Sequence, residues 1–228
     1  MPKKDSSSVW DQVVEYLNYL SNQPPGFVIH GEKASKETSN KQQLLKQLFA
    51  PYANCTRCPL GTLGRNTVVF GEGDPDADLM FVGEGPGREE DAQGRPFVGR
   101  AGKLLNNIIV AMHFAREDVY ISNVVKCRPP NNRAPLPIES GTCKNILLLK
   151  EISIVKPKII CTLGATATQA LLGPEARLSQ MRGQVHELGP YLLMPTYHPA
   201  YLLRNPAAKK IVWQDMQQIM RLLAQSKQ

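Results

Sequence analysis

The stretch "PKIICTLGATATQALLG", residues 157–173, contains a short apolar run followed directly by a helix-forming segment. The run from 157 to 164 is apolar at consecutive positions, without the alternation of a strand that has one face in water. The segment from 165 to 173 is rich in Ala and Leu and closes at Gly173, as many helices do. The stretch therefore predicts one β–α unit whose strand is buried on both faces.

Three further units of the same kind occur along the chain. Each has an apolar strand before a helix: 77–83 before 101–114, 118–125 before 138–155, and 191–197 before 207–225. Strands that alternate with helices form parallel sheets, because each helix carries the chain back across the sheet. The sequence therefore predicts an α/β protein, a three-layer α/β/α sandwich with a central four-stranded parallel sheet.

The N-terminal part of the chain does not follow this pattern. Residues 9–21, "VWDQVVEYLNYLS", place apolar side chains at helical spacing, and residues 22–43 are polar and contain Pro-Pro-Gly. We therefore expect residues 1–40 to form an N-terminal helix and a flexible linker. Residues 41–228 are expected to form the main domain.

The composition indicates a basic globular protein. The 228 residues carry a formal net charge of +7 with a pI near 9.2, which favours polyanionic partners such as nucleic acids. No apolar run approaches the roughly 20 residues of a membrane-spanning helix. The N-terminus is polar where a signal peptide needs its apolar centre. We therefore expect a cytoplasmic monomer that does not bind membranes.

Irregular polar segments follow the predicted strands. They are "GEGPGREED" (83–91), "NVVKCRPPNNRAP" (123–135), "GATAT" (164–168) and "YHPAYLLRN" (197–205). Ligands of open parallel sheets bind at this edge, outside the carboxyl ends of the strands. Neither nucleotide-binding motif is complete, because Arg88 replaces the last glycine of Gly-x-Gly-x-x-Gly and Leu104 replaces the Ser/Thr of a phosphate loop. The glycines of the first segment do allow the backbone to approach a flat ligand closely.

Five cysteines in a reducing compartment favour metal or redox chemistry over a disulfide framework. Cys55 and Cys58 form a Cys-x-x-Cys pair, and Cys127 and Cys143 follow much later in the chain. Four such thiolates bind zinc or an iron–sulfur cluster, and the separation of the second pair favours the cluster. Cys161 lies inside an apolar strand and is expected to be a buried core thiol.

Several blocks of the sequence together resemble one known family. They are "CTRCPLG" (55–61), "GEGPGREEDAQGRPFVGRAGKLL" (83–105), "NVVKCRPPNNRAP" (123–135) and "YHPAYLLR" (197–204). In these blocks the chain is similar to the iron–sulfur uracil-DNA glycosylases, the thermostable-type fourth group of the uracil-DNA glycosylase superfamily. The resemblance covers about residues 45–225.

The resemblance implies hydrolysis of the N-glycosidic bond of uracil in single- or double-stranded DNA, which leaves an abasic site. It also implies a [4Fe–4S] cluster on Cys55, Cys58, Cys127 and Cys143. The related group that traps its substrate covalently carries a histidine in a basic insert after the third cysteine. The corresponding stretch here, "RPPNNRAPLPIESGTC", contains no histidine, which favours hydrolysis.

Residues at the strand ends receive their roles from the same resemblance. It implies that Phe97 stacks on uracil, that Asn123 hydrogen-bonds the polar edge of the base, and that the backbone around Glu84 and Gly85 lines the pocket. It further implies that His198 donates a hydrogen bond to a uracil oxygen as negative charge develops on the departing base.

Better-known uracil glycosylases carry an Asp at the position of Gly85, so the usual water-orienting carboxylate is missing. We therefore predict that Glu90 orients the attacking water. The turn after His198 is predicted to insert into the duplex and to contact phosphate through Leu202, Leu203 and Arg204. Two other functions stay open: an iron–sulfur DNA-binding accessory module without glycosylase activity, and a nucleotide- or phosphate-handling α/β enzyme.

Overall fold

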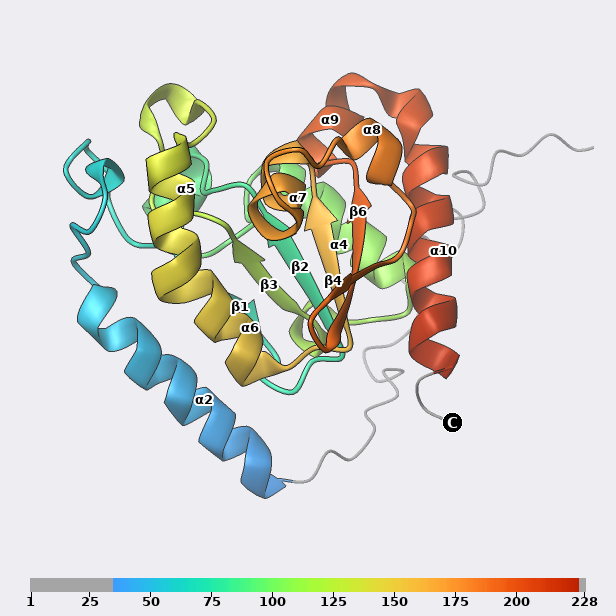
Figure 1. The fold of residues 1–228 in the computed structure, drawn as a ribbon, viewed down its shortest axis with the longest axis horizontal. Helices are drawn as coiled ribbons and strands as arrows, with labels where there is room; N and C mark the ends of the chain where they lie inside the picture. Colours follow the sequence, from blue (N-terminus) through green and yellow to red (C-terminus); the bar gives the residue numbers. More distant parts are fainter. Residues whose placement is uncertain (1–34, 226–228) are drawn as a thin grey trace, which may run out of the picture.

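The computed structural model describes residues 35–225 (Figure 1). The predicted helix at 9–21 and most of the predicted linker lie outside these residues. A six-stranded sheet with the strand order β1-β3-β2-β4-β6-β5 forms the centre of the described part.

Four parallel strands make up the middle of this sheet, as the sequence predicted. They are β3 (Tyr120–Asn123), β2 (Leu79–Gly83), β4 (Ile159–Leu163) and β6 (Tyr191–Thr196), in spatial order. Every residue of β2, β3 and β4 is buried, which explains why their sequences lack alternation.

Two short edge strands were not predicted. β1 (Glu72–Gly73) pairs antiparallel with β3, and β5 (His186–Leu188) pairs antiparallel with β6. Both strands are too short and too polar to give a periodic signal. Their pairing depends on neighbours that are already in place. Within residues 35–225 the sheet therefore has six strands in all, of which four form the parallel core and two lie antiparallel at its edges.

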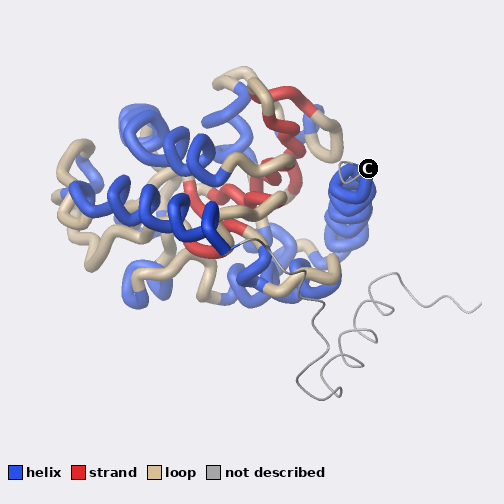
Figure 2. The backbone as a smooth tube through the Cα atoms, turned by 90° about the horizontal axis from the view of Figure 1, so that it is seen from below, coloured by secondary structure: helices blue, strands red, loops and turns tan. Residues whose placement is uncertain are grey.

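Helices cover both faces of the sheet, so the predicted three layers are confirmed (Figures 1 and 2). Alternate residues of one strand point to opposite faces: Phe81 belongs to one core cluster and Met80 to the other. The first cluster includes residues of α4 (Arg100–Ala111), α9 (Pro199–Arg204) and α10 (Lys209–Gln225). The second includes residues of α2 (Ser35–Phe49), α5 (Pro137–Cys143), α6 (Leu149–Val155) and α7 (Ala165–Leu172).

Shorter elements join these layers. A π-helical turn at Lys144–Leu148 connects α5 with α6, and α3 (Arg88–Gln93) and α8 (Leu178–Met181) lie in the connections. Single 3₁₀ turns occur at Ala50–Tyr52, Pro59–Gly61, Arg116–Asp118, Pro130–Asn132 and Pro206–Ala208. None of the helices within residues 35–225 is long and apolar enough to cross a membrane.

The helix α2 crosses the boundary that the sequence placed at residue 40. It begins at Ser35, so the last residues of the predicted linker are helical. This segment is polar, but it contains neither Pro nor Gly, and polarity alone does not prevent a helix. Lys41 anchors α2 to the body, because its ammonium group donates to the carbonyl of Val155 at 3.0 Å and pairs with Asp76 at 2.8 Å.

Candidate active site

A pocket of about 640 Å³ opens at the carboxyl ends of the parallel strands. It is lined by residues of the segments that follow β2, β3 and β6, which is where the sequence predicted a ligand site. Of the predicted site residues, the lining contains Glu84, Gly85, Glu90, Phe97, Asn123 and His198. The structure therefore brings together the residues predicted to bind and cleave the substrate.

Asn123 stands at the end of β3, and its side chain has an unsatisfied acceptor. The residue is 2% exposed, and its Oδ1 atom has no hydrogen-bond partner among residues 35–225. A buried acceptor without a partner destabilises a fold by about 1–3 kcal/mol. Gly83 makes room for this group: a Cβ atom there would lie 2.5 Å from Asn123 Oδ1 and 2.4 Å from Cζ of Phe97. The amide and the aromatic ring thus meet at one glycine on the pocket wall.

A buried ion pair supports the backbone behind Asn123. The ammonium group of Lys126 donates to the Asn123 carbonyl at 2.9 Å and pairs with the carboxylate of Glu151. Ser122 donates to the same carboxylate at 2.8 Å, and the Gly71 amide donates to its other oxygen at 3.1 Å. Lys126 and Glu151 are both fully buried, so each charge depends on the other for its stabilisation.

Phe97 forms one wall of the pocket in an unusual backbone conformation. Its φ angle is +52°, in the left-handed region that non-glycine residues rarely adopt. The residue is 4% exposed, and its ring centroid lies 5.6 Å from that of His198 with the ring planes 30° apart. The two rings therefore face the same space from neighbouring walls.

His198 caps the N-terminus of α9 with its own ring. The backbone amide of Ala200 donates to Nδ1 at 3.1 Å, so a neutral ring carries its proton on Nε2. Burial, together with the positive charge of Arg204, lowers the pKa of His198 from 6.5 to about 4, and the negative charge of Glu90 opposes part of this shift. Gly164, at φ +93°, lets the next loop approach, because a Cβ atom there would lie 3.1 Å from Cβ of His198. The site thus holds a neutral imidazole with a fixed donor.

Glu90 has a structural task that the sequence did not indicate. One oxygen accepts the amide of Gly87 at 3.1 Å, and the other accepts the amides of Val98 at 3.0 Å and Gly99 at 2.8 Å. These bonds cap α3 and hold the start of α4. Its carboxylate is therefore largely occupied by the backbone.

The side chain of Glu84 is less constrained than that of Glu90. Glu84 lies in the loop between β2 and α3. One of its oxygens accepts a short hydrogen bond from the hydroxyl of Thr166, at the N-terminal end of α7. Glu84 also lines the pocket with its neighbours. The segment 164–168, which the sequence placed at this edge, therefore contributes through Thr166 and Gly164.

The predicted DNA-contacting turn needs one correction. Leu202 is 1% exposed and packs in the core cluster that includes α10, so it is not available as a wedge. Leu203 is 37% exposed and Arg204 is exposed, in agreement with a contact surface. Tyr201, which the sequence analysis did not select, is 37% exposed beside them. Adjacent residues of a short helix point in different directions, and only its docking decides which of them is buried.

Further cations that the sequence analysis did not select surround the pocket. Arg88 and Arg100 line it and are exposed, and Arg128 lines it from the segment after β3. Arg128 donates from Nε to Oδ1 of Asn132 at 2.8 Å. Three glutamates line the same pocket, so these guanidinium groups offer separate anion-binding positions at the rim and not a uniform positive surface.

The four predicted ligand cysteines lie near one another, away from the pocket lining. Cys127 is 5% exposed and Cys143 is 7% exposed, and Cys55 and Cys58 pack against the same core cluster. Burial is the largest cause that raises the pKa of Cys127 to about 12; the other three thiols add to the increase, and the charge of Arg65 opposes it. The Lys126 amide donates to Sγ of Cys143 at 3.3 Å. The donor set is four thiols from three separate segments.

These thiols do not surround one point. Within residues 35–225 there is no group of three or more His, Cys, Asp or Glu side chains placed to hold a single metal ion. A [4Fe–4S] cluster uses a different arrangement, because each thiolate binds its own iron at a corner of the cluster. Cys161 is fully buried in β4, so its prediction as a core thiol is confirmed.

Comparisons with known proteins identify the family of the chain. Residues 70–217 match the family model of the uracil DNA glycosylase superfamily. The chain is 46% identical over 181 residues to the type-4 uracil-DNA glycosylase of Thermotoga maritima, covering 78% of this chain and 93% of that protein. It is 41% identical over 187 residues to the type-4 uracil-DNA glycosylase of Sulfurisphaera tokodaii, covering 78% and 84%. The chain therefore belongs to the uracil-DNA glycosylase superfamily.

Proposed function

We propose that the protein removes uracil from DNA by hydrolysing the N-glycosidic bond and leaves an abasic site. The observation that carries the proposal is the buried, unpartnered Oδ1 of Asn123, on the pocket wall beside Phe97 and His198. The names of the type-4 relatives support the same reaction.

The polar edge of uracil matches this amide. Oδ1 of Asn123 accepts the ring N–H of uracil, and the amide nitrogen donates to an adjacent carbonyl. Cytosine carries an acceptor in place of that N–H and an amino group in place of that carbonyl, so with the amide in this orientation it would leave both groups of Asn123 unsatisfied. Phe97 contributes the aromatic face on which the base stacks once it has left the duplex.

His198 assists the departure of the base. Negative charge grows on the uracil oxygens as the glycosidic bond breaks, while positive charge grows on the sugar. The neutral ring donates from Nε2, because Nδ1 already accepts the Ala200 amide. Such a donor stabilises the transition state more than the bound substrate.

We propose that a carboxylate between β2 and α4 orients the attacking water, with Glu90 in α3 and Glu84 in the loop before α3 as the two candidates. Glu90 has about one acceptor site left after its three backbone bonds, whereas the carboxylate of Glu84 accepts from Thr166 alone in the described part of the chain. Single-turnover cleavage by Glu90→Gln and Glu84→Gln separates them. The variant that slows cleavage at an unchanged melting temperature identifies the water-orienting group.

The DNA is held by the exposed surface around the pocket. We propose that Leu203 enters the duplex and that Arg204 contacts a backbone phosphate. The pocket lining includes Arg88, Arg100 and Arg128, which we expect to contact the DNA strand that delivers the uracil. The net charge of +7 supports such contacts with single- or double-stranded DNA.

We propose that Cys55, Cys58, Cys127 and Cys143 hold a [4Fe–4S] cluster. The residues fit this group, because the other three thiols lie close enough to Cys127 to raise its pKa and the two later thiols are buried. When bound, the cluster supplies cross-links between these segments and takes no part in bond cleavage. A cluster bound to Cys127 would thereby hold in place the loop between Asn123 and Cys127.

We also propose that the catalytic unit is the domain predicted at 41–228, extended to the start of α2. All lining residues of the pocket lie between Glu84 and Ala200. We therefore expect the predicted N-terminal helix and the part of the linker before Ser35 to contribute little to base removal. We further propose that the enzyme acts in the cytoplasm as a monomer.

Release of free uracil from oligonucleotides that contain one uracil tests the proposal. Matched oligonucleotides with cytosine or thymine at the same position are the controls. We expect free uracil and an alkali-labile abasic site from the first oligonucleotide alone. DNA binding without base release would instead identify an accessory module, and binding of free nucleotides with no effect on DNA would identify a nucleotide-handling enzyme.

A further inference from the structure

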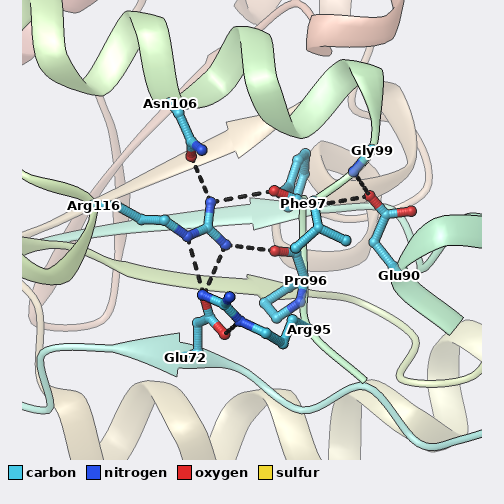
Figure 3. A network of polar contacts seen from close by, with 9 residues as sticks. Glu72, Glu90, Arg95, Pro96, Phe97, Gly99, Asn106 and Arg116 are labelled. Atoms are coloured by element: carbon cyan, nitrogen blue, oxygen red, sulfur yellow. Dashed lines mark hydrogen bonds and ion pairs between the residues drawn. The ribbon is translucent and has the colours of Figure 1, made fainter. Parts of the chain in front are cut away.

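The turn that contains Phe97 lies between a carboxylate on one side and a guanidinium group on the other (Figure 3). On one side, Glu90 accepts the amides of Val98 and Gly99 at 3.0 and 2.8 Å. On the other side, the guanidinium group of Arg116 donates to the carbonyls of Pro96 at 2.5 Å and Phe97 at 3.2 Å. Two successive carbonyls thus face a cation, and the next two amides face an anion. This arrangement counteracts the unfavourable left-handed conformation of Phe97.

Arg116 uses all of its hydrogen-bond donors in this region. Besides the two carbonyls, it donates to Oδ1 of Asn106 at 2.6 Å. Its Nε and Nη2 donate to one oxygen of Glu72 at 3.0 and 2.9 Å. All five N–H groups of the guanidinium are therefore engaged. A lysine has three donors on one nitrogen and cannot span these partners.

The position of Arg116 separates this task from contact with the substrate. It lies in the 3₁₀ turn after α4 and does not line the pocket. Its side chain is 18% exposed, and Glu72, which holds it, also pairs with Arg95 at 2.9 Å. Arg116 therefore reaches the pocket only through the backbone of the Phe97 turn.

We propose that Arg116 is a positioning residue, which fixes the Phe97 ring in the orientation that stacks on the extruded uracil. The inference rests on the proposed function, because it takes Phe97 as the stacking surface. Without the guanidinium, the turn relaxes toward an ordinary backbone conformation. The ring then moves relative to Asn123 and His198, which are held by other elements.

A double-mutant cycle tests this role, with Arg116→Lys, Phe97→Leu and the two combined. Each variant is measured by single-turnover uracil release well below its melting temperature. We expect Arg116→Lys to slow release about tenfold when Phe97 is present and less than twofold in the Phe97→Leu background. Equal slowing in both backgrounds, or a wild-type rate for Arg116→Lys, would overturn the proposal, because a general structural defect does not depend on the ring.

Arg95→Gln is the matched control. It removes the other cation of Glu72, but it leaves both carbonyl contacts of Arg116 in place, so we expect a rate within twofold of wild type. If Arg116→Lys does not fold, Asn106→Ala replaces it in the cycle. That variant frees one Nη1 donor and keeps the ion pair, and we expect a smaller loss, a few-fold, that again disappears with Phe97→Leu.

The cycle also separates this inference from the proposed function. If Phe97→Leu releases uracil at the wild-type rate, stacking on Phe97 is wrong, and the role of Arg116 is wrong with it. If Phe97→Leu is slow and the effects of the two changes are independent, the glycosylase proposal stands and the role of Arg116 alone is overturned.

Discussion

The protonation of His198 gives a quantitative prediction about the site. Burial and the charge of Arg204 lower the pKa of this ring from 6.5 to about 4. At pH 5 only about a tenth of the molecules would then carry a charged ring, whereas at the ordinary pKa roughly 97% would. We therefore expect the neutral ring, with its proton on Nε2, to persist through the whole pH range from 8 down to 5.

The nitrogen chemical shifts of the ring in ¹⁵N-labelled protein report both the pKa and the tautomer. His198→Gln identifies the signal, because it disappears in that variant alone. A titration near pH 6.5, or a proton on Nδ1, would refute the reasoning. The same pKa shift makes stability depend on pH. The ring binds a proton near pH 6.5 in the unfolded chain but only near pH 4 in the folded protein. The free energy of unfolding therefore decreases as the pH falls from 6.5 toward about 4.

Three further changes test other parts of the structure. Cys127→Ala should lower iron content and melting temperature together while Cys161→Ala keeps the iron, and iron loss at unchanged stability would contradict the structural role of the cluster. Arg204→Ala should weaken DNA binding and reduce the slope of log affinity against log salt by about one, so an unchanged slope would remove the phosphate contact. Glu151→Gln leaves Lys126 buried without its anion and should lower the free energy of urea unfolding by about 3–5 kcal/mol, and a loss below 1 kcal/mol would speak against a buried charged pair.

The fold was predictable where burial leaves a direct trace in the sequence. The run from 157 to 164 is apolar because β4 is covered on both faces, and the same holds for β2 and β3. The edge strands β1 and β5 leave no such trace. The polar stretch before Lys41 was assigned to a linker, although its last residues, from Ser35 on, belong to α2.

The sequence indicated which residues line the pocket. It did not indicate the hydrogen bonds and packing that hold them there. Asn123 ends one parallel strand, and Phe97 and His198 come from the segments after two others. The carboxyl ends of these strands lie at one edge of the sheet, so the proximity of the three residues follows from the topology. The exposure of Leu203 and the burial of Leu202 depend on how α9 docks on the core, which spacing does not reveal. The role of Arg116 depends on partners many positions away, such as Glu72, and no local pattern indicates it.

The central claim is that this pocket cleaves uracil from DNA with His198 as the transition-state donor. The direct measurement is the single-turnover rate of uracil release by His198→Ala, with DNA affinity measured in parallel. The account predicts a rate lower by about 10²–10³, as for the loss of one such donor, and an affinity within a few-fold of wild type. Uracil release by His198→Ala at nearly the wild-type rate would contradict it.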